Sequence, residues 1–326
     1  MIERVLGHLA GHGVDEAVLS LGYLPDAFTE AYPDGHAAGV RLTYAVEPEP
    51  LDTAGAVRFA AAFAAIDETF VVVNGDVLTD LDLTSLVAFH RERHAEGTIH
   101  LHPVTDPSAF GVVPTDPEGR VTAFVEKPPR DEAPTNEINA GTYVLEPSVL
   151  DRIAASGRVS IERETFPAMV RDGGLYARAD DRYWIDTGTP VAFLEANFDY
   201  VEGRRGPDIA PGLADRGDGV FIRDGSELEG DIVARSVVFA GCTVETGARV
   251  ERSVLGRGAV ISSGALVKDS VLMDDCHVAS DATVAGSIMG PRSIVGQRAD
   301  VRPVSVLGAD AVVSSGSIID GERVSG

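Results

Sequence analysis

The 326-residue sequence is poor in positive charge. It has 51 acidic residues against 27 basic ones, a formal net charge of −24, and its only lysines are Lys127 and Lys268. This excess of negative charge argues against a nucleic-acid partner and against an anionic membrane surface. Because lysine is so rare in the chain, a lysine at the end of a predicted strand is a candidate site residue.

Long hydrophobic runs are also missing. The sequence has no stretch of about twenty apolar residues and no signal-peptide pattern, so we expect no membrane association and a cytoplasmic chain. A chain of 326 residues is long enough for two domains with sizeable cores.

One buried strand is predicted at residues 70–76. Phe70 and three valines follow one another, which is typical of a strand covered on both faces, and the run ends in Asn74-Gly75-Asp76. Ligands of open α/β sheets bind where such strands end, and an aspartate there suits Mg²⁺. The alternative is that the three residues only form the next turn.

Helices and strands are predicted to alternate through the first two hundred residues. We expect helices near 2–9 and at 54–66, 84–94, 148–155 and 163–171, and strands at 17–21, 40–47, 70–76 and 98–104. Such alternation predicts an α/β fold with a doubly wound, mostly parallel sheet. Short strands at 111–114, 121–127 and 140–145 are expected to form a lid or accessory sheet. Because the first helix has no strand before it, we also expect an opening βα element to be missing.

The last hundred residues contain a repeat. Serine recurs at spacings of 17, 17, 17 and 18, and apolar residues follow each serine at plus 1, plus 8 and plus 14. The serines are Ser236, Ser253, Ser270, Ser287 and Ser305. Three inward residues per turn with glycines between them predict a three-sided parallel β-helix, similar to the hexapeptide-repeat left-handed β-helix. The expected organisation is a first domain at 1–202, a Gly- and Pro-rich linker at 203–219 and the β-helix at 220–326.

The repeat also decides how the two cysteines are interpreted. Cys242 and Cys276 both lie at plus 6, two coils apart, which corresponds to about 9.6 Å between their Cα atoms. A disulfide needs less than about 7 Å, so we expect two structural, unbridged cysteines.

Further polar residues lie at predicted strand ends of the first domain. A second aspartate, Asp186, follows an apolar pair, and one of the rare lysines lies in Glu126-Lys127. Gly111, Asn139 and Gly141 add glycines and an amide. Carboxylates for a divalent cation, a lysine for a phosphate and polar groups for hydroxyls together predict a site for a phosphorylated sugar.

In chain order these segments resemble the sugar-1-phosphate nucleotidyltransferases, most of all the mannose-1-phosphate guanylyltransferase branch. The matching segments are 47–54 (EPEPLDTA), 74–76 (NGD), 110–113 (FGVV), 126–128 (EKP), 139–141 (NAG), 160–164 (SIERE) and 184–188 (WIDTG). The resemblance implies attack of a sugar phosphate oxygen on the α-phosphorus of a nucleoside triphosphate, with release of pyrophosphate.

The resemblance also implies roles for individual residues. Asp76 and Asp186 would hold Mg²⁺, and Lys127 would pair with the sugar phosphate; these three are the candidate catalytic residues. The candidate substrate-binding residues are Glu47, Thr53, Ala54, Asn74, Gly75, Gly111, Glu126, Asn139 and Gly141.

The chain departs from the family pattern in two places. The opening strand and glycine-rich loop that cradle the triphosphate would precede Met1, so we expect either a misassigned gene start, which we favour, or a shortened and weakly active chain. Asp52 stands where many members carry glycine, and a carboxylate there could crowd the nucleotide.

The base and the activity class remain open at this point. Glu47 could accept from the two donors of guanine, whereas thymine or uracil would suit a glutamine; Glu47 could equally be a solvated strand end. Thymidylyl or uridylyl transfer to glucose 1-phosphate, a non-catalytic regulatory subunit and a hexapeptide acyltransferase using His277 are the alternatives. An open edge coil predicts a homo-oligomer that forms through the β-helix.

Overall fold

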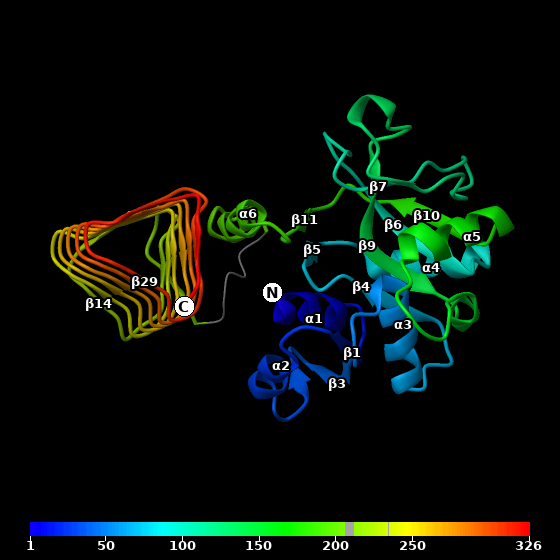
Figure 1. Cartoon of the computed structure of the whole chain (residues 1–326), viewed down its shortest axis with the longest axis horizontal. Helices are drawn as coiled ribbons and strands as arrows, with labels where there is room; N and C mark the ends of the chain where they lie inside the picture. The colour runs from blue at the N-terminus through cyan, green and yellow to red at the C-terminus, as the bar shows by residue number, and fades with distance from the viewer. Residues whose placement is uncertain (206–211, 234) are drawn as a thin grey trace. The chain divides into compact units, whose positions relative to one another are not determined.

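The computed structural model describes residues 1–205, 212–233 and 235–326 (Figure 1). The chain divides into two compact units, Met1–Ile185 and Asp186–Gly326, each with its own core. The predicted linker, 203–219, lies inside the second unit, and its residues 206–211 lie outside the described part of the chain.

The first unit contains the predicted alternation of helices and strands. Its elements are α1 (Ile2–Gly11), β1 (Glu16–Leu21), α2 (Pro25–Ala31), β2 (His36–Ala37), β3 (Val40–Val46), α3 (Asp52–Phe63), β4 (Phe70–Val73), β5 (Val77–Thr79), α4 (Leu83–Arg93), β6 (Gly97–Pro103), β7 (Gly111–Val112), β8 (Val125–Glu126), η1 (Arg130–Glu132), β9 (Glu137–Leu145), η2 (Pro147–Arg152), η3 (Ile161–Thr165), α5 (Phe166–Asp172), β10 (Leu175–Ala179) and β11 (Trp184–Asp186). The α/β class is confirmed. The short elements α2, β2, β5 and β10 were not predicted.

The strands of this unit form a small and a large sheet, and β5 pairs separately with β11. The small sheet has the order β1-β3-β2, and the large one has the order β10-β6-β9-β7-β8 with β4 also paired to β9. Strand β9 runs antiparallel to β4, β6 and β7, so the pairing is mixed rather than mostly parallel. The prediction of a separate lid or accessory sheet is therefore wrong for β9, because this strand lies in the middle of the main sheet.

Helices cover both faces of the large sheet, as expected of a doubly wound fold. Tyr143 and Leu145 of β9 pack in one cluster with Phe166 of α5, whereas Val144 packs in another with Leu86 of α4. This follows from the alternation of side chains along a strand. Each fully buried side chain of this kind contributes about 1.5–3 kcal/mol.

The second unit is a three-sided parallel β-helix with the helix α6 (Pro190–Val201) on its surface. One side has the order β12-β13-β16-β19-β22-β25-β28-β31, the second β14-β17-β20-β23-β26-β29, and the third β15-β18-β21-β24-β27-β30. The strands are β12 (Ala214–Asp215), β13 (Phe221–Ile222), β14 (Glu227–Leu228), β15 (Asp231–Val233), β16 (Val237–Val238), β17 (Thr243–Val244), β18 (Arg249–Glu251), β19 (Val254–Leu255), β20 (Val260–Ile261), β21 (Leu266–Lys268), β22 (Val271–Leu272), β23 (His277–Val278), β24 (Thr283–Ala285), β25 (Ile288–Met289), β26 (Ile294–Val295), β27 (Asp300–Arg302), β28 (Val306–Leu307), β29 (Val312–Val313), β30 (Ile318–Asp320) and β31 (Arg323–Val324). The predicted repeat is confirmed.

One of the three predicted inward columns is wrong by a single residue. The plus 8 and plus 14 residues lie in the β-helix core, but the third inward column is at plus 2, as in Leu255 and Leu272. The plus 1 residues, such as Val271 and Ile288, point outward and pack against Leu194 and Phe198 of α6. Neighbouring strand residues face opposite sides, and both sides of this strand are covered, so both positions are apolar.

The serines hold successive coils together inside the structure. All five are fully buried, and the N–H of Ser270 donates to Oγ of Ser253 (3.1 Å), as that of Ser287 does to Oγ of Ser270 (3.1 Å). The 18-residue coil interrupts this ladder. There the N–H of Ser305 donates to the carbonyl of Arg302 (3.2 Å) instead, because the extra residue forms a turn before it.

The cysteines are free and buried, as predicted. Their thiols donate to the carbonyls of Gly256 (3.0 Å) and Gly290 (3.1 Å), and burial raises the pKa of Cys242 to about 11. Both thiols are therefore protonated and structural at neutral pH.

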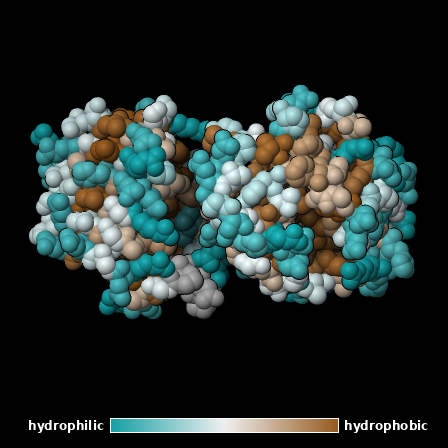
Figure 2. Space-filling view, turned by 90° about the horizontal axis from the view of Figure 1, so that it is seen from below, coloured by the Kyte–Doolittle hydropathy of each residue, from teal (hydrophilic) through white to brown (hydrophobic). Residues whose placement is uncertain are grey.

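The surface agrees with the composition. Hydrophilic residues cover much of both units on the face shown in Figure 2, with smaller apolar areas between them. None of the described helices has both the length and the apolar character needed to cross a membrane.

Candidate active site

The predicted site residues at 74–76, 111, 126–127 and 139–141 lie along one edge of β9. Strand β4 follows this edge only as far as Val73, opposite Thr142, and β7 reaches it at Ile138. The stretch Asn139–Gly141 lies between these two strands. Polar residues from the end of β4 and from the β7–β8 hairpin meet at this gap in the strand pairing.

The turn Asn74-Gly75-Asp76 forms one side of the gap. β4 ends at Val73, three residues earlier than predicted, and the N–H of Asn74 donates to the carbonyl of Gly141 (2.9 Å). All three turn residues are exposed. A Cβ at Gly75 would meet nothing within 4 Å, so the fold itself does not require glycine there. Packing therefore does not explain this glycine, whereas the close approach of a ligand to the backbone would.

Gly141, in contrast, is required by the local structure. Its φ is +74°, and a Cβ would lie 2.7 Å from the amide nitrogen of Asn74. A side chain at this position would push the Asn74 turn away from β9.

The hairpin of β7 and β8 forms the opposite side of the gap. Gly111 pairs with Glu126, and a Cβ at Gly111 would lie 3.0 Å from Oε2 of that glutamate. Lys127 follows with a left-handed φ of +48° and an N–H bonded to the carbonyl of Phe110 (3.0 Å). Its side chain is 61% exposed, with Nζ 3.9 Å from Glu126, so its charge is available at the end of the hairpin.

Asn139 and Tyr143 form the floor of the gap. The amide of Asn139 donates to the Tyr143 hydroxyl (2.9 Å), and its Oδ1 accepts from the N–H of Gly141 (3.1 Å). Burial, followed by the charges of Glu162 and Glu126, raises the pKa of Tyr143, so the phenol stays neutral. The sequence reasoning missed Tyr143 and Glu162, although both lie in or beside matching segments, 139–141 and 160–164.

The segment 47–54 lies at the ends of β1 and β3. Glu47 is held there, since its carboxylate accepts from Oγ of Ser20 (3.0 Å) and from the N–H of Leu51 (3.2 Å). Asp52 has a φ of +63°, a conformation that glycine adopts without cost. That backbone requirement explains why glycine fits this position well.

Thr53 and Ala54 differ in how they can act. The Thr53 hydroxyl is exposed to solvent and bonds to Glu162 (2.9 Å). Ala54 is fully buried in the core, and its N–H donates to the carbonyl of Val159 (2.9 Å). The structure therefore gives Ala54 a packing role at the start of α3.

Asp186 is the first residue of the second unit, and its Oδ1 accepts from the N–H of Gly188 (2.8 Å). The cap of α6 is Thr189, so Asp186 does not cap that helix. Within the described residues there is no group of three or more His, Cys, Asp or Glu that could hold a metal. Two carboxylates completed by phosphate and water oxygens, as Mg²⁺ prefers, would not need such a group.

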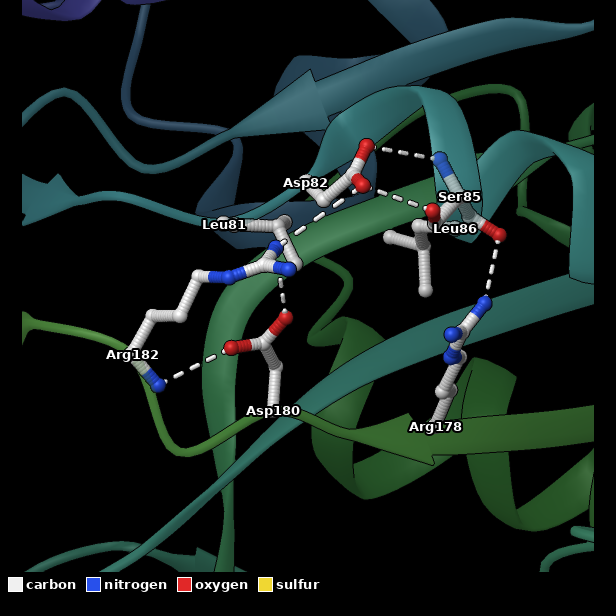
Figure 3. A pocket seen from close by; sticks show the side chains of 7 residues that line it. All are labelled: Leu81, Asp82, Ser85, Leu86, Arg178, Asp180 and Arg182. Carbon is white, nitrogen blue, oxygen red and sulfur yellow. Dashed lines mark hydrogen bonds and ion pairs between the residues drawn. The ribbon is translucent and has the colours of Figure 1, made fainter.

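A small pocket lies elsewhere in the first unit, between the start of α4 and the end of β10 (Figure 3). Its residues are Leu81, Asp82, Ser85, Leu86, Arg178, Asp180 and Arg182. The charges bond to partners within the pocket, as Arg182 does to Asp180 (3.1 Å) and Arg178 to the carbonyl of Ser85 (2.8 Å). Its volume of about 20 Å³ is enough for a single water molecule. We therefore assign this pocket a structural role.

Comparison with known proteins now places the chain. Residues 1–203 match the family model described as "Nucleotidyl transferase", and this range contains every predicted site residue. The chain belongs to the nucleotidyl transferase family. Residues 232–325 match the model described as "GMPPB C-terminal domain", which agrees with the β-helix. The family resemblance expected from the motifs is thus confirmed.

Two curated relatives and one solved structure illustrate the match. "Mannose-1-phosphate guanylyltransferase" of Mycobacterium tuberculosis is 39% identical over 269 residues, which are 76% of this chain and 73% of that protein. "Mannose-1-phosphate guanyltransferase" of Emericella nidulans is 41% identical over 207 residues, which are 62% of this chain and 56% of that protein. The structure of HddC from Yersinia pseudotuberculosis, complexed with GMP-PN, has a TM-score of 0.52 at 26% identity and covers 60% of this chain and 83% of that one. The match to the Emericella nidulans protein therefore spans little more than half of that protein's length.

Proposed function

We propose that this nucleotidyl transferase joins a nucleoside triphosphate, with GTP favoured, to a sugar 1-phosphate, with mannose 1-phosphate favoured. The products are the nucleoside diphosphate sugar, GDP-mannose in the favoured case, and pyrophosphate. The observation that supports the proposal is the gap beside Asn139–Gly141, with the Asn74–Asp76 turn on one side and the hairpin that carries Glu126 and Lys127 on the other. The names of the two curated relatives support the choice of GTP and mannose 1-phosphate.

In the proposed reaction an oxygen of the sugar phosphate attacks the α-phosphorus while the bond to pyrophosphate breaks. Lys127 binds the sugar phosphate as a point charge, and Glu126 and Asn139 accept and donate to the sugar hydroxyls. Asp76 and Asp186 offer carboxylate oxygens to Mg²⁺, which when bound offsets charge that develops around the α-phosphate. The protein contributes mainly positioning and electrostatic stabilisation.

The choice of guanine rests on Glu47. Each oxygen of its carboxylate already accepts one hydrogen bond from the protein, which fixes its orientation, and each retains a further lone pair. A carboxylate fixed in this way can accept from both donors on the Watson–Crick edge of guanine. Uracil and thymine offer one donor beside acceptors and would pair less well.

The acyltransferase alternative is not supported by the β-helix. His277 lies on the outer side of β23, and its Nε2 bonds to Oγ of Ser262 (3.1 Å). Among the described residues, no carboxylate bonds to the His277 ring. The pair therefore lacks the acidic residue that orients the histidine in a catalytic triad.

Assembly and location follow as parts of the proposal. Homo-oligomers would form through the β-helix, whose outer surface carries the exposed apolar residues Ile294 and Val312 on neighbouring strands. A nucleoside triphosphate donor supports the predicted cytoplasmic location.

The test is pyrophosphate release with GTP, Mg²⁺ and mannose 1-phosphate, compared with UTP, dTTP and glucose 1-phosphate. The chain would be assayed beside a version extended upstream to the preceding in-frame start. Activity in either form that prefers GTP and mannose 1-phosphate supports the proposal. Preference for UTP or dTTP overturns the base assignment, and silence of both folded forms with all substrates supports a regulatory role instead.

A further inference from the structure

The loop that begins α3 is attached to the segment before η3. The N–H of Val159 donates to the carbonyl of Leu51 (3.0 Å), and the N–H groups of Ala54 and Gly55 both donate to the carbonyl of Val159 (2.9 and 3.2 Å). The two segments are more than a hundred residues apart in sequence, yet these backbone bonds make them one structural piece.

Glu162 adds a side-chain link to this piece. Its Oε2 accepts from the hydroxyls of Thr53 (2.9 Å) and Ser160 (3.0 Å). The Thr53 hydroxyl in turn accepts from the N–H of Ile161 (2.8 Å), so it is used as donor and acceptor at once. A carboxylate with two hydroxyl donors and a threonine with both roles filled have well-defined orientations.

The turn that carries Glu162 also packs against the floor of the proposed sugar site, because Ile161 and Phe166 lie in one core cluster with Tyr143. Glu162 lies in the π-helical turn η3, which continues into α5, and the ring of Phe166 in α5 packs edge-on against Tyr143 at 5.1 Å between centroids. Burial, and after it the charge of Glu162, raises the pKa of the Tyr143 phenol, and that phenol accepts a hydrogen bond from the Asn139 amide. Single π-helical turns are frequent at functional sites.

We propose that Glu162 is a positioning residue that couples the nucleotide side of the site, through Thr53, to the sugar side, through Tyr143 and Asn139. This inference rests on the proposed function, in which Glu47 binds the base and Asn139 the sugar; we place Thr53 on the nucleotide side because it lies in the same segment as Glu47, 47–54. Because Thr53 is hydrogen-bonded to Glu162 and Tyr143 packs against the turn that carries it, a substrate that holds one side in its bound arrangement also favours the bound arrangement of the other side. Binding of each substrate then strengthens binding of the other by the same factor.

Thr53 and Glu162 provide matched variants for the test. Thr53→Val keeps the shape of the side chain and removes the hydroxyl, whereas Thr53→Ser keeps the hydroxyl. Glu162→Ala removes the acceptor, whereas Glu162→Gln keeps a carbonyl oxygen that can accept from Thr53 and Ser160. Arg163→Gln serves as the control, because its side chain is exposed on the next residue of the same turn.

The measurement is the dissociation constant of a non-hydrolysable GTP analogue, determined by calorimetry with Mg²⁺ and with or without mannose 1-phosphate. We expect the sugar phosphate to tighten binding about tenfold in the unsubstituted chain, in Thr53→Ser, in Glu162→Gln and in the control. In Thr53→Val and in Glu162→Ala, the dissociation constants measured without and with mannose 1-phosphate should be nearly equal, so that their ratio is close to one. The double variant should have the same ratio as either single variant. If these residues had a merely structural role, the substitutions would raise both dissociation constants by the same factor and leave their ratio unchanged.

The possible failures can be told apart. If the unsubstituted chain shows the ratio and Thr53→Val, folded by circular dichroism, retains it, only the coupling role of Glu162 is overturned. If the analogue binds but mannose 1-phosphate has no effect on it, the coupling is likewise overturned. If neither compound binds to the folded chain, the proposed function fails together with the inference.

Discussion

Asp76 has the most demanding role among the single residues, because the proposed chemistry places a cation on it. It lies in an exposed turn after β4, so its substitution leaves no cavity in the core. We expect Asp76→Asn to lower kcat by about 100-fold or more, the size of effect seen when one preorganised electrostatic contact is removed. The thermal midpoint should change little.

Pyrophosphate release and circular dichroism check this prediction on the same preparations. Asp67→Asn, an exposed aspartate in the loop before β4, is the matched control and should keep full activity. An active Asp76→Asn would remove this residue from the site.

His100 gives the molecule a pH dependence that is independent of the site. It is 1% exposed on β6, no partner is recorded among the described residues for either ring nitrogen, and burial lowers its pKa to about 4. In the unfolded chain its pKa is about 6.5. The unfolded state therefore binds a proton that the folded state refuses, so stability falls as the pH drops from about 6.5 to 4.

We expect His100 to lower the free energy of unfolding by at most about 3 kcal/mol between neutral pH and pH 4. Urea unfolding of the chain and of His100→Leu, between pH 7.5 and pH 4, measures it. As the pH falls, the unfolding free energy of the unsubstituted chain should decrease relative to that of the leucine variant. A difference that is constant with pH would mean that His100 has the same pKa in the folded and the unfolded chain.

Which site residues could be predicted depended on their chemistry. Glu126, Lys127 and Asn139, which lie at the gap in the strand pairing, could be chosen as candidates because charged or amide groups at strand ends are conspicuous in the sequence. Tyr143 and Glu162 were not, because a tyrosine in an apolar strand resembles a core residue, and the role of Glu162 depends on contact with Thr53, 109 positions away. Such contacts are set by tertiary packing and leave no local pattern.

At the scale of elements, α6 covers a column of outward β-helix residues. Phe198, 6% exposed, packs in the same cluster as Val271, and the guanidinium of Arg252 lies 4.2 Å from the centre of its ring. Phe198→Ala should destabilise the second unit by about 3 kcal/mol, the low end for a buried phenylalanine. Val191→Ala on the exposed side of the same helix should change it by less than about 0.5 kcal/mol.

Chemical unfolding followed by circular dichroism would measure both variants. Equal effects of the two substitutions would show that α6 does not pack on the β-helix in solution.

The same helix explains why one β-helix column was misplaced. Each of the five serines of the repeat is followed by two apolar residues, and the pattern does not say which of the two faces the core. The choice depends on α6, whose apolar residues could have covered other surfaces. Spacing and coil number, in contrast, could be predicted because repetition itself is visible in the sequence.

At the scale of the whole molecule, the division into two units makes a claim about folding. The β-helix has its own core, and its strands pair within the second unit. We therefore expect a fragment of residues 187–326, which keeps the Thr189 cap of α6, to fold alone. Its thermal transition should coincide with one of two transitions of the full chain.

Calorimetry of the fragment and of the full chain tests this expectation. An unfolded fragment beside a single cooperative transition of the full chain would contradict it. The sequence predicted that a β-helix follows an α/β domain, but placed their division later than the structure does. It set the boundary at the Gly- and Pro-rich stretch 203–219, so α6 fell in the first domain, whereas in the structure α6 packs on the β-helix.

The serine ladder has a consequence for the gene as well as for the protein. Because each 17-residue coil repeats the contacts of its neighbours, an in-frame duplication or loss of one coil's codons would preserve the pairing of every remaining strand. The length of the β-helix can therefore change between lineages in single steps, with few compensating substitutions. The coil before Ser305 has 18 residues, so its duplication or loss would not match the 17-residue repeat of the others. We therefore expect the number of coils to vary on the N-terminal side of this coil.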